Sequence, residues 1–377
     1  MDNAINDLDP ETRILRTRID DRNAHAIVTP IYQCSAFSSE SPYFYSRKDN
    51  PNVKELEQVI SGLEGNCHAL AVTTGMTAIS LAISQIRPGQ EIVLGSDIYG
   101  CTYKLFQRVA ERLECKLHIL DLSTAEGIQD IPSGAAMVFF ETPTIPFLKT
   151  ISIKKVSSAA KSKSPQCLVV VDNTWATPLF QKPLEFGADI CVYSATKYFS
   201  GHSDVMGGFL TTKSDFLAEK LSAERFYHGA VLAPHSAWLL RRSMQTFALR
   251  MHHHVAVTRA LVPFLCEFSQ IEKVYVPDID GEQLTEYGGI IFCKLAASCK
   301  SKYRELATAL KLFDTGTGMA CVTSMIAQPF SGSHASMTED EKLVMGLGPD
   351  IIRLCFGLES IEDLKNDLRN GFSQLGC

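Results

Sequence analysis

Short apolar runs alternate with stretches of helical periodicity through the first half of the chain, and this rhythm constrains the fold more than any other feature. The runs are ALAVTT (69–74), EIVLGS (91–96), AAMVFFET (135–142), CLVVVDN (167–173) and DICVYSA (189–195). Nearly continuous apolar runs of this length are typical of strands buried on both faces, and the helical stretches between them supply the crossovers. The pattern predicts an α/β fold built on a mainly parallel sheet.

One helix among these runs is well marked at both ends. Asn50 is a good N-cap, and Pro51 suits the first helical position. The residues that then recur at helical spacing are Val53, Leu56, Val59, Ile60 and Leu63. We therefore expect a helix that begins at Pro51 and ends just before Gly65.

The second half of the chain is organised differently. A stretch without turn signals runs from 237 to 268, is interrupted only by Pro263, and predicts a long helix leading into a second unit. Shorter elements follow, with strands expected at 288–296, 322–328 and 350–358 and helices at 301–313 and 360–375. The order of these elements predicts an α+β unit.

The last helix is expected to begin with a capping box of Ser360 and Asp363, and to bury one apolar face. The residues of that face are Leu364, Leu368, Phe372 and Leu375. A chain of 377 residues exceeds the size at which one core usually stops growing, so two domains are expected. The predicted divisions are an N-terminal arm at 1–48, a large domain at 49–236 and a C-terminal domain at 237–377.

Composition excludes several classes of partner. Lysine and arginine number 36 against 42 aspartate and glutamate residues, so the net charge is −6 and the isoelectric point is near 6.0. Such a chain has no general attraction for nucleic acid or anionic lipid. The twelve cysteines form no CxxC pair, and the first residues are acidic without an apolar core. We expect a cytoplasmic protein that binds no metal or membrane and acts on small molecules.

The stretch from 169 to 208 carries the clearest chemical signal. Asp172 ends one predicted strand, and Lys197 follows the next, 25 residues later. Pyridoxal 5′-phosphate (PLP) chemistry needs a lysine amine to hold the cofactor and a carboxylate to keep the pyridine nitrogen protonated. The two residues therefore make PLP one hypothesis for this chain.

A PLP phosphate would need backbone amides and hydroxyl groups. Gly75 and Met76 lie where the run 69–74 turns directly into a predicted helix, whose N-terminus suits an anion. Ser194 and Thr196 flank Lys197 and add hydroxyl donors.

Other interpretations of these residues are open. An aspartate at a strand end is often a helix cap, and a lysine after a strand is often solvated. Ser194 and Lys197 also match the S-x-x-K pattern of serine acyl enzymes, although the chain has no K-T-G element. Three consecutive histidines (252–254) on a helix point about 100° apart and cannot converge on one metal ion, so a solvated helix face is the better interpretation.

At Lys197 the chain resembles a known family. YSATKYFSGHSDVMGG (193–208) is similar to the lysine-bearing signature of the Cys/Met-metabolism PLP-dependent enzymes. This fold-type I group contains cystathionine γ-synthase, the cystathionine lyases, methionine γ-lyase and O-acylhomoserine sulfhydrylases. Further resemblances follow in order along nearly the whole chain: TPIYQCSAF (29–37), YSRKDNP (45–51), ALAVTTGMTAI (69–79), DIYGCTYKLF (97–106), ETPT (141–144), VVDNTWATP (170–178), GAVLAPHSAWLLRRSMQTFALRM (229–251) and IIRLCFGLESIEDL (351–364).

The resemblance implies a role for each matched residue. Lys197 would hold PLP as a Schiff base, and Asp172 would pair with the pyridinium nitrogen. Tyr99 would stack on the ring and act as an acid or base. The phosphate would be held by Gly75, Met76, Ser194 and Thr196, with Tyr45 and Arg47 reaching it from the neighbouring subunit. The substrate would be bound by Arg353, Ser324 and Tyr45.

The resemblance also implies an activity and an assembly. The activity is PLP-dependent γ-elimination or γ-replacement on a sulfur-containing or O-activated homoserine-type L-amino acid. The fold implied is that of a fold-type I enzyme, with a large cofactor domain and a smaller C-terminal domain. YGCT (99–102) is closest to methionine γ-lyase, while a γ-synthase, a sulfhydrylase, a β-lyase and a non-catalytic PLP binder are the alternatives. Family members form homodimers with shared sites, usually paired into tetramers.

Two segments depart from the family pattern. Ile145 stands where the family usually has an asparagine, which reaches the cofactor's ring hydroxyl and the substrate carboxylate. In 323–340, Thr323 replaces a common acidic residue, and a few residues are inserted before His334. Cys101 beside Tyr99 is open to two interpretations, a functional thiol or a small core residue. These departures predict unusual substrate selection.

Overall fold

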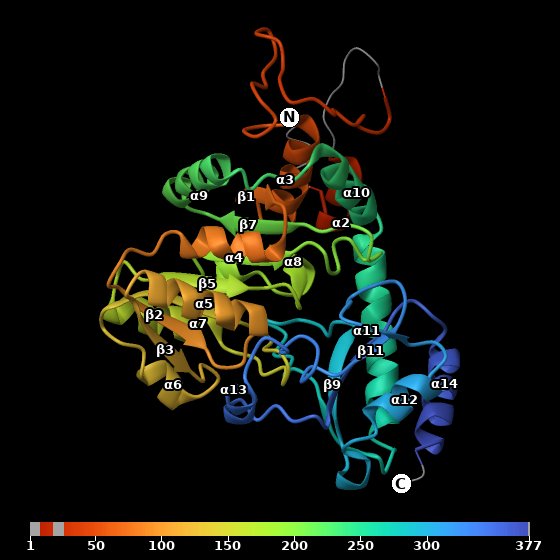
Figure 1. Cartoon of the computed structure of the whole chain (residues 1–377). Helices are drawn as coiled ribbons and strands as arrows, with labels where there is room; N and C mark the ends of the chain where they lie inside the picture. Colours follow the sequence, from red (N-terminus) through yellow and green to blue (C-terminus); the bar gives the residue numbers. More distant parts are fainter. Residues whose placement is uncertain (1–7, 18–25, 376–377) are drawn as a thin grey trace.

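Two β-sheets organise the protein in this computed structural model, which describes residues 8–17 and 26–375. The first sheet has seven strands in the order β1-β7-β6-β5-β4-β2-β3, and the second has five in the order β10-β11-β12-β9-β8. Figure 1 shows the first sheet with its helices in the upper and left part of the molecule, and the second sheet at the lower right beside α11, α12 and α14.

The strands predicted in the first half are confirmed. They are β1 (His68–Val72), β2 (Glu91–Gly95), β4 (Ala135–Glu141), β5 (Leu168–Asp172) and β6 (Ile190–Ser194). Two further strands, β3 (Lys116–Leu120) and β7 (Gly208–Thr212), were not predicted, because β3 is a half-exposed edge strand and β7 begins with glycine and ends with two threonines. Strands β2 to β6 pair in parallel, whereas β7 runs antiparallel to both β1 and β6. The mainly parallel sheet is therefore confirmed.

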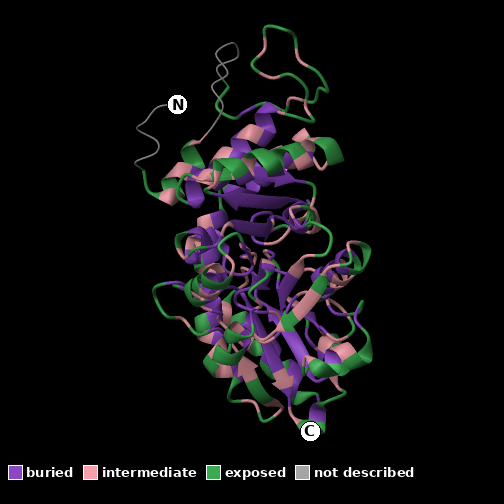
Figure 2. Ribbon diagram, turned by 90° about the vertical axis from the view of Figure 1, so that its left-hand side faces the viewer, coloured by how far each residue is buried: buried purple, intermediate pink, exposed green. Residues whose placement is uncertain are grey.

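Helices cover both faces of this sheet. One face packs against α4 (Gly75–Ile83), α5 (Gly100–Arg112) and α9 (Asp215–His228), and the other against α3 (Pro51–Leu63) and α7 (Ile153–Lys163). Short helices α6 (Ala125–Gln129) and α8 (Thr177–Phe180) and the 3₁₀ turn η1 (Pro183–Glu185) complete the layer. Burial on both faces explains why the central strands have continuous apolar sequences, as Figure 2 shows.

The predicted helix at residue 51 is confirmed as α3. The Asn50 side chain accepts a hydrogen bond from the Asn52 backbone amide at 3.0 Å, and Pro51 occupies the first position. Helix α2 (Pro10–Arg16) packs on α3 through Ile14, and Arg13 Nη1 donates to the Gly62 carbonyl at 2.9 Å. This part of the predicted arm therefore lies on its own chain.

The single long helix predicted at 237–268 is wrong. The chain forms two helices, α10 (Pro234–Met244) and α11 (Phe247–Leu265). Pro263 lies inside α11, two residues before the helix ends. The break falls at Thr246, because the Ser243 carbonyl is taken by the Thr246 hydroxyl at 3.2 Å and by Arg250 Nη2 at 3.1 Å. Side-chain competition for a helical carbonyl is not visible as a turn signal in the sequence.

The second sheet packs with its helices around a separate apolar cluster. Its strands are β8 (Ile271–Tyr275), β9 (Ile290–Leu295), β10 (Asp314–Thr315), β11 (Met325–Ala327) and β12 (Ile351–Cys355). Its helical elements are η2 (Ala297–Cys299), α12 (Tyr303–Ala309), α14 (Ile361–Ser373) and the second half of α11. Helix α13 (Glu339–Val344) lies instead against α5, where Glu341 pairs with Lys104 at 2.7 Å. The three predicted strands correspond to β9, β11 and β12, and the pairing is mostly antiparallel, as expected of an α+β unit.

The predicted apolar face of α14 is confirmed, because each of its four residues is at most 1% exposed. Its predicted capping box is wrong, since the Ser360 side chain makes no cap hydrogen bond. A full capping box stands instead on α13, between Thr338 and Glu341.

The segment from 26 to 49 protrudes from the large sheet and is mostly exposed. It forms the loop at the top of Figure 1, and a β-bridge between Ala36 and Tyr45 joins its two sides. Residues 1–7 and 18–25 of the predicted arm lie outside the described residues. The arm's contribution to a second subunit stays a prediction.

Glu64 gives the fold a testable pH dependence. This carboxyl ends α3, is fully buried and accepts a hydrogen bond from the Tyr193 hydroxyl. Burial raises its pKa to about 8, so the folded protein keeps a proton that the unfolded chain releases above about pH 4.3. The free energy of unfolding should therefore fall as the pH rises from about 5 to 8.

Glu64→Gln should remove the contribution of this one proton to the pH dependence of the free energy of unfolding, which is up to about 1.4 kcal/mol per pH unit. Urea unfolding of both proteins at several pH values measures it. Glu126→Gln on exposed α6 is the control and should keep the original slope. Parallel slopes for wild type and Glu64→Gln would contradict the assignment.

Candidate active site

A cavity of about 550 Å³ lies at the carboxyl end of the first sheet and extends to the second. Neighbouring parallel strands β4, β5 and β6 end there with Glu141, Asp172 and Ser194. Carboxyl ends of parallel strands meet at one edge, which is where α/β proteins bind ligands. The predicted site residues that line the cavity are Gly75, Met76, Tyr99, Asp172, Ser194, Thr196, Lys197 and Arg353.

Lys197 lies on the tight turn that follows β6. Its backbone amide donates to the Ser194 carbonyl at 3.2 Å, and its carbonyl accepts from Gly201 at 2.8 Å. Arg250 on α11 secures the next residues, donating to the Tyr198 carbonyl at 2.7 Å. Burial lowers the pKa of the Lys197 amine, and the nearby Arg353 charge lowers it further. An amine with a lowered pKa is a better nucleophile and base near neutral pH.

Asp172 is the acid at the centre of this edge. It ends β5, and its carboxylate accepts a hydrogen bond from the Thr174 amide at 3.0 Å. The Thr174 hydroxyl in turn accepts from the Ser194 amide at 2.8 Å, which ties the ends of β5 and β6 together. Burial raises the pKa of Asp172. A protonated pyridine nitrogen beside this carboxyl would lower its pKa and would favour the charged carboxylate.

Glu141 is a site residue that the sequence interpretation did not assign. It pairs in register with Asp172 on the neighbouring strand, and its Oε1 accepts from the Tyr99 amide at 3.0 Å. Its Oε2 is buried without a hydrogen-bond partner. Burial, and then the Asp172 charge, raise the pKa of Glu141 well above its usual range. The sequence held one sign of this role, because Glu141 ends a predicted strand in the same way as Asp172.

The N-terminus of α4 forms an anion cradle. Thr74 caps the helix by accepting from the Thr77 amide at 3.0 Å, and Gly75 and Met76 line the cavity. A Cβ on Gly75 would lie 2.8 Å from Ser194 Cβ and 3.0 Å from its Cα, so only glycine allows this approach. Backbone amides of this helix and the hydroxyls of Ser194 and Thr196 suit a phosphate group.

Tyr99 precedes α5, and its ring lines the cavity beside Cys101. Burial raises the pKa of the Tyr99 hydroxyl, and the adjacent Cys101 thiol raises it further, so the hydroxyl keeps its proton at neutral pH. Cys101 does not itself line the cavity, and both interpretations of this cysteine stay open.

Arg353 provides a buried positive charge on β12. Only 4% of it is exposed, and its guanidinium donates to the Gly318 carbonyl and lies 3.5 Å from Met319 Sδ. Its Nε is buried without a partner. Neutral partners leave the charge uncompensated, which suits an incoming carboxylate.

Ser324, Tyr45 and Arg47 do not line this chain's cavity. The buried Ser324 hydroxyl donates to Glu359 at 2.8 Å and accepts from the Gly357 amide at 2.9 Å, so it supports the end of β12. Arg47 lies over the Phe226 ring at 4.1 Å and donates to the Phe226 carbonyl at 2.9 Å. The predicted roles of Tyr45 and Arg47 require a second copy, and all three roles stay predictions.

The competing interpretations gain no support from the geometry. Across residues 8–17 and 26–375, no group of histidine, cysteine or acidic side chains is arranged to hold a metal, and no helix is long and apolar enough to cross a membrane. The solvated-face prediction for the three histidines is wrong for His254, which is fully buried against Tyr198 because α11 packs inward there. His252 is exposed and pairs with Glu11 at 2.7 Å.

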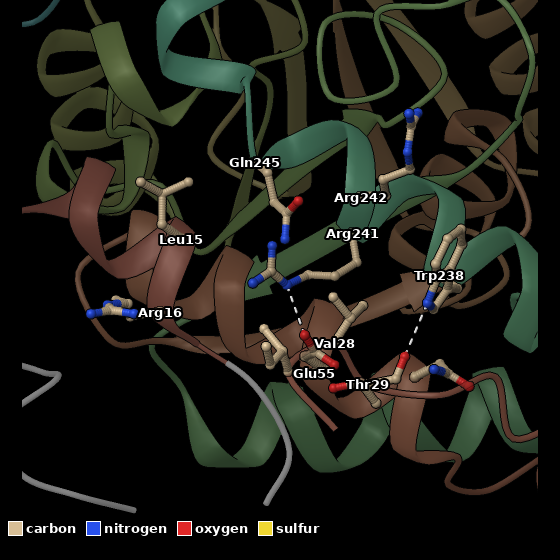
Figure 3. Close-up of a pocket in the computed structure, with 11 residues that line it drawn as sticks. Leu15, Arg16, Val28, Thr29, Glu55, Trp238, Arg241, Arg242 and Gln245 are labelled. Atoms are coloured by element: carbon tan, nitrogen blue, oxygen red, sulfur yellow. Dashed lines mark hydrogen bonds and ion pairs between the residues drawn. The ribbon is translucent and has the colours of Figure 1, made fainter. Parts of the chain in front are cut away.

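A second cavity of about 370 Å³ lies at the base of the arm (Figure 3). Arg241 pairs with Glu55 at 2.8 Å across it, and Trp238 donates to the Thr29 carbonyl at 3.0 Å. Arg241 also donates to the Thr17 carbonyl at 2.7 Å, so the chain is fastened to α10 at both Thr17 and Thr29. We assign this cavity a structural role.

Comparison with known proteins agrees with the site geometry. Residues 11–373 match the family model described as Cys/Met metabolism PLP-dependent enzyme. Cystathionine beta-lyase of Lactococcus lactis subsp. cremoris is 35% identical over 94% of this chain and 96% of its own length, and L-methionine gamma-lyase of Fusobacterium nucleatum subsp. nucleatum is 33% identical over 93% and 94%. Cystathionine gamma synthase from Xanthomonas oryzae pv. oryzae superimposes with a TM-score of 0.93, at 31% identity over 98% and 99% of the chains.

The fold and the site thus define a PLP-dependent enzyme of fold-type I. The chain belongs to the Cys/Met-metabolism PLP-dependent enzyme family. The residues present fit the cofactor, because the cavity combines a half-buried amine, an acid at the adjacent strand end and an anion cradle that excludes a Cβ. Bound PLP supplies an electron sink for the carbanion formed at the substrate's α-carbon.

Gly208 tests the anion cradle. A Cβ on this β7 residue would lie 2.2 Å from the Thr74 carbonyl oxygen and 2.8 Å from the Gly75 nitrogen, both of which are backbone atoms. Gly208→Ala should destabilise the protein by about 1–3 kcal/mol through overpacking and weaken cofactor retention by displacing the cradle. Thermal unfolding and cofactor absorbance after dialysis measure both effects.

Gly134→Ala is the matched control, because its Cβ would meet only the end of the Glu91 side chain, at 3.2 Å. We expect wild-type stability and cofactor content for this variant. Full cofactor retention by Gly208→Ala would contradict the tight junction between β7 and α4.

Asp172 and Glu141 should differ in their effects on cofactor binding. Glu141 has the carboxyl whose pKa is raised well above its usual range, so it is the partner expected to be protonated, and Glu141→Gln should change cofactor affinity less than about threefold. Asp172→Asn removes the charged partner of the ring nitrogen. A hydrogen bond to a charged group contributes about 1.5–3 kcal/mol, so this variant should lose more than tenfold in cofactor affinity. Titration of apoenzyme with PLP measures both, and equal losses would contradict the assignment.

Proposed function

We propose that this enzyme catalyses γ-elimination or γ-replacement on a sulfur-containing or O-activated homoserine-type L-amino acid, either as a carbon–sulfur lyase of the methionine γ-lyase type or as a γ-synthase. The observation that carries the proposal is the half-buried Lys197 amine, whose pKa is lowered, in one cavity with the uncompensated Arg353 guanidinium. An amine base and a carboxylate anchor are what removal of an α-proton from an amino acid requires.

Each residue has a proposed task. Lys197 would hold PLP through its amine and would carry the proton from the substrate's α-carbon. Asp172 keeps the pyridine nitrogen protonated, and Arg353 orients the substrate carboxylate. Tyr99 covers the ring and transfers a proton through its hydroxyl, helped by its protonated state at neutral pH. Phosphate binding falls to Gly75, Met76, Ser194 and Thr196.

The rest of the lining favours an uncharged substrate side chain. Ile145, Met206 and Met319 contribute much of the wall, which is more apolar than polar. Such a wall suits the methylenes and sulfur of a thioether. Ile145 also makes this part of the cavity less polar than the asparagine usual in the family would.

A shared-site homodimer is part of the proposal. Tyr45 lies on a protruding segment outside its own cavity, and Arg47 lies beside it. A second copy would place these groups at the phosphate end of the site. Cross-complementation of a Lys197→Ala subunit with an Arg47→Ala subunit, measured as recovered activity in mixed dimers, distinguishes this arrangement from independent sites.

The central test is chemical labelling of Lys197. Purified protein should be yellow, and borohydride reduction should abolish the absorption and fix the cofactor on Lys197, as peptide mass mapping would show. Lys197→Ala should lose the label, whereas Lys213→Ala, at an exposed position, should keep it. A label on another lysine would overturn the site assignment.

A substrate panel separates elimination from replacement. The enzyme is incubated with L-methionine, L-cystathionine, L-cysteine and O-acetyl-L-homoserine, with and without an added thiol. For a lyase we expect keto acid and ammonia in equal amounts whether or not the thiol is present. Thioether formation that depends on the thiol, with little keto acid, would instead identify the γ-synthase or sulfhydrylase alternative.

A further inference from the structure

A chain of buried side-chain amides lies behind the cofactor edge of the first sheet. Its three members are Asn173, Gln181 and Gln283, and each of them is at most 5% exposed. None of the three lines the active-site cavity. Asn173 directly follows Asp172 at the end of β5, Gln181 follows α8, and Gln283 lies in the connection from β8 to β9. The three amides therefore join parts of the protein that carry different halves of the site.

The Gln181 side chain uses both of its N–H groups and its oxygen. Its Nε2 donates to the Thr142 carbonyl at 2.7 Å and to Asn173 Oδ1 at 2.8 Å. Its Oε1 accepts from Gln283 Nε2 at 3.0 Å. The Gln181 carbonyl also accepts from Asn173 Nδ2 at 2.8 Å, so these two residues are joined twice. Loss of this one amide would leave several buried polar groups without a partner, which is costly.

Backbone partners fix the direction of the whole chain of amides. At one end, Gln283 Oε1 accepts from the Ile153 amide at 2.8 Å. At the other end, Asn173 Nδ2 donates to the Tyr193 hydroxyl at 3.0 Å, and this hydroxyl donates to Glu64. Because a backbone N–H can only donate and a backbone carbonyl can only accept, none of the three amides can be reversed. Hydrogen bonds aligned in one direction polarise one another, so the chain is a rigid connector.

On one side this connector holds the strand ends that carry the two acids of the site. Thr142 follows Glu141 at the end of β4, and Asn173 follows Asp172 at the end of β5. Glu141 and Asp172 are the last paired residues of these two strands. Because Gln181 donates to the residue after each of them, it holds the two strand ends together beyond the sheet.

On the other side the connector holds the path to the second sheet. Gln283 lies within residues 276–289, which join β8 to β9. Strand β9 pairs along its length with β12, the strand that carries Arg353. The contact between Gln181 and Gln283 therefore links the position of Arg353 to that of Asp172.

We propose that Gln181 is a positioning residue for the reaction, which holds Asp172 at the cofactor ring and Arg353 at the substrate carboxylate in one fixed arrangement through its side-chain amide. Gln181 lies outside the cavity and acts through Asn173 and Gln283. This inference rests on the proposed function, because Asp172 and Arg353 have the tasks assigned to them there.

The first test replaces the amide by an apolar side chain of the same length. Gln181→Met leaves the Thr142 carbonyl and Asn173 Oδ1 without their donor, so the end of β5 should shift. Asp172 would then hold the proton on the ring nitrogen less firmly, and a protonated ring draws electrons from the nitrogen that joins Lys197 to the cofactor. The pH midpoint of the cofactor's absorption change should therefore rise by about 0.5 unit or more, and kcat should fall about tenfold or more.

Gln283→Met tests the link to the second sheet. It keeps both donors of Gln181, so the pH midpoint should not change. The position of Arg353 should change, so L-norleucine, an amino acid without a leaving group, should bind about three- to tenfold more weakly, as it should in Gln181→Met. Titration followed by the absorption of the bound cofactor measures this dissociation constant without turnover. Gln283→Met is also the second variant if Gln181→Met does not fold.

Two comparisons separate positioning from loss of stability. Ser157→Ala removes a buried hydrogen bond of 2.7 Å from α7 to the Gly187 carbonyl. It should lower the midpoint of thermal unfolding and keep the pH midpoint, kcat and L-norleucine binding of wild type. The double variant Gln181→Met/Gln283→Met should bind L-norleucine no more weakly than Gln181→Met alone, because Gln283 acts through Gln181. Independent structural defects would instead add.

The outcomes are distinguishable. An unchanged pH midpoint in Gln181→Met, or losses no larger than those of Ser157→Ala, overturn the inference and leave the proposed function standing. Additive weakening of L-norleucine binding in the double variant overturns it as well. Wild-type protein that binds PLP and L-norleucine but turns over none of the substrate panel contradicts the proposed function alone, since the pH midpoint and L-norleucine binding still test Gln181.

Discussion

Partial desolvation of the Lys197 amine is the condition on which the rest of the site depends. An exposed lysine keeps its proton and its hydration, and would be neither nucleophile nor base at neutral pH. The turn after β6 places the amine between the two sheets, and Arg250 holds the following backbone through the Tyr198 carbonyl. The same burial raises the pKa values of Asp172 and Glu141, so the charges at this edge are set for a cationic ring and an anionic substrate.

The two ends of the cavity have different origins. The cofactor end is built from strand ends and a helix N-terminus, which are fixed by the sheet and match the family closely. The other end is lined by Ile145, Thr317, Met319, Gly332 and Ser333. Ile145 and the segment 323–340 are the two places where the chain departs from the family pattern, so both departures lie at this end of the cavity.

Local patterns predicted the elements whose burial is simple. The central strands are buried on both faces and read as continuous apolar runs, and α3 has its cap and its apolar stripe in the sequence. Prediction was wrong where tertiary contacts override local signals. The break at Thr246 depends on Arg250 reaching back to Ser243, and the β7 strand depends on a close approach to Thr74 that glycine permits. Glu141 was missed because its importance comes from its register beside Asp172.

The sequence by itself determined the fold class, the lysine and aspartate pair and the family, since these depend on residue types at fixed spacings along two adjacent parallel strands. Tertiary structure alone decided which side chains share the cavity. It placed Glu141 and Ser333 inside, set Ser324 behind β12, and left Tyr45 and Arg47 outside their own chain's site. The physical reason is that desolvation and hydrogen-bond partners are properties of a packed neighbourhood, which brings together residues as far apart in the chain as Tyr99 and Ser333.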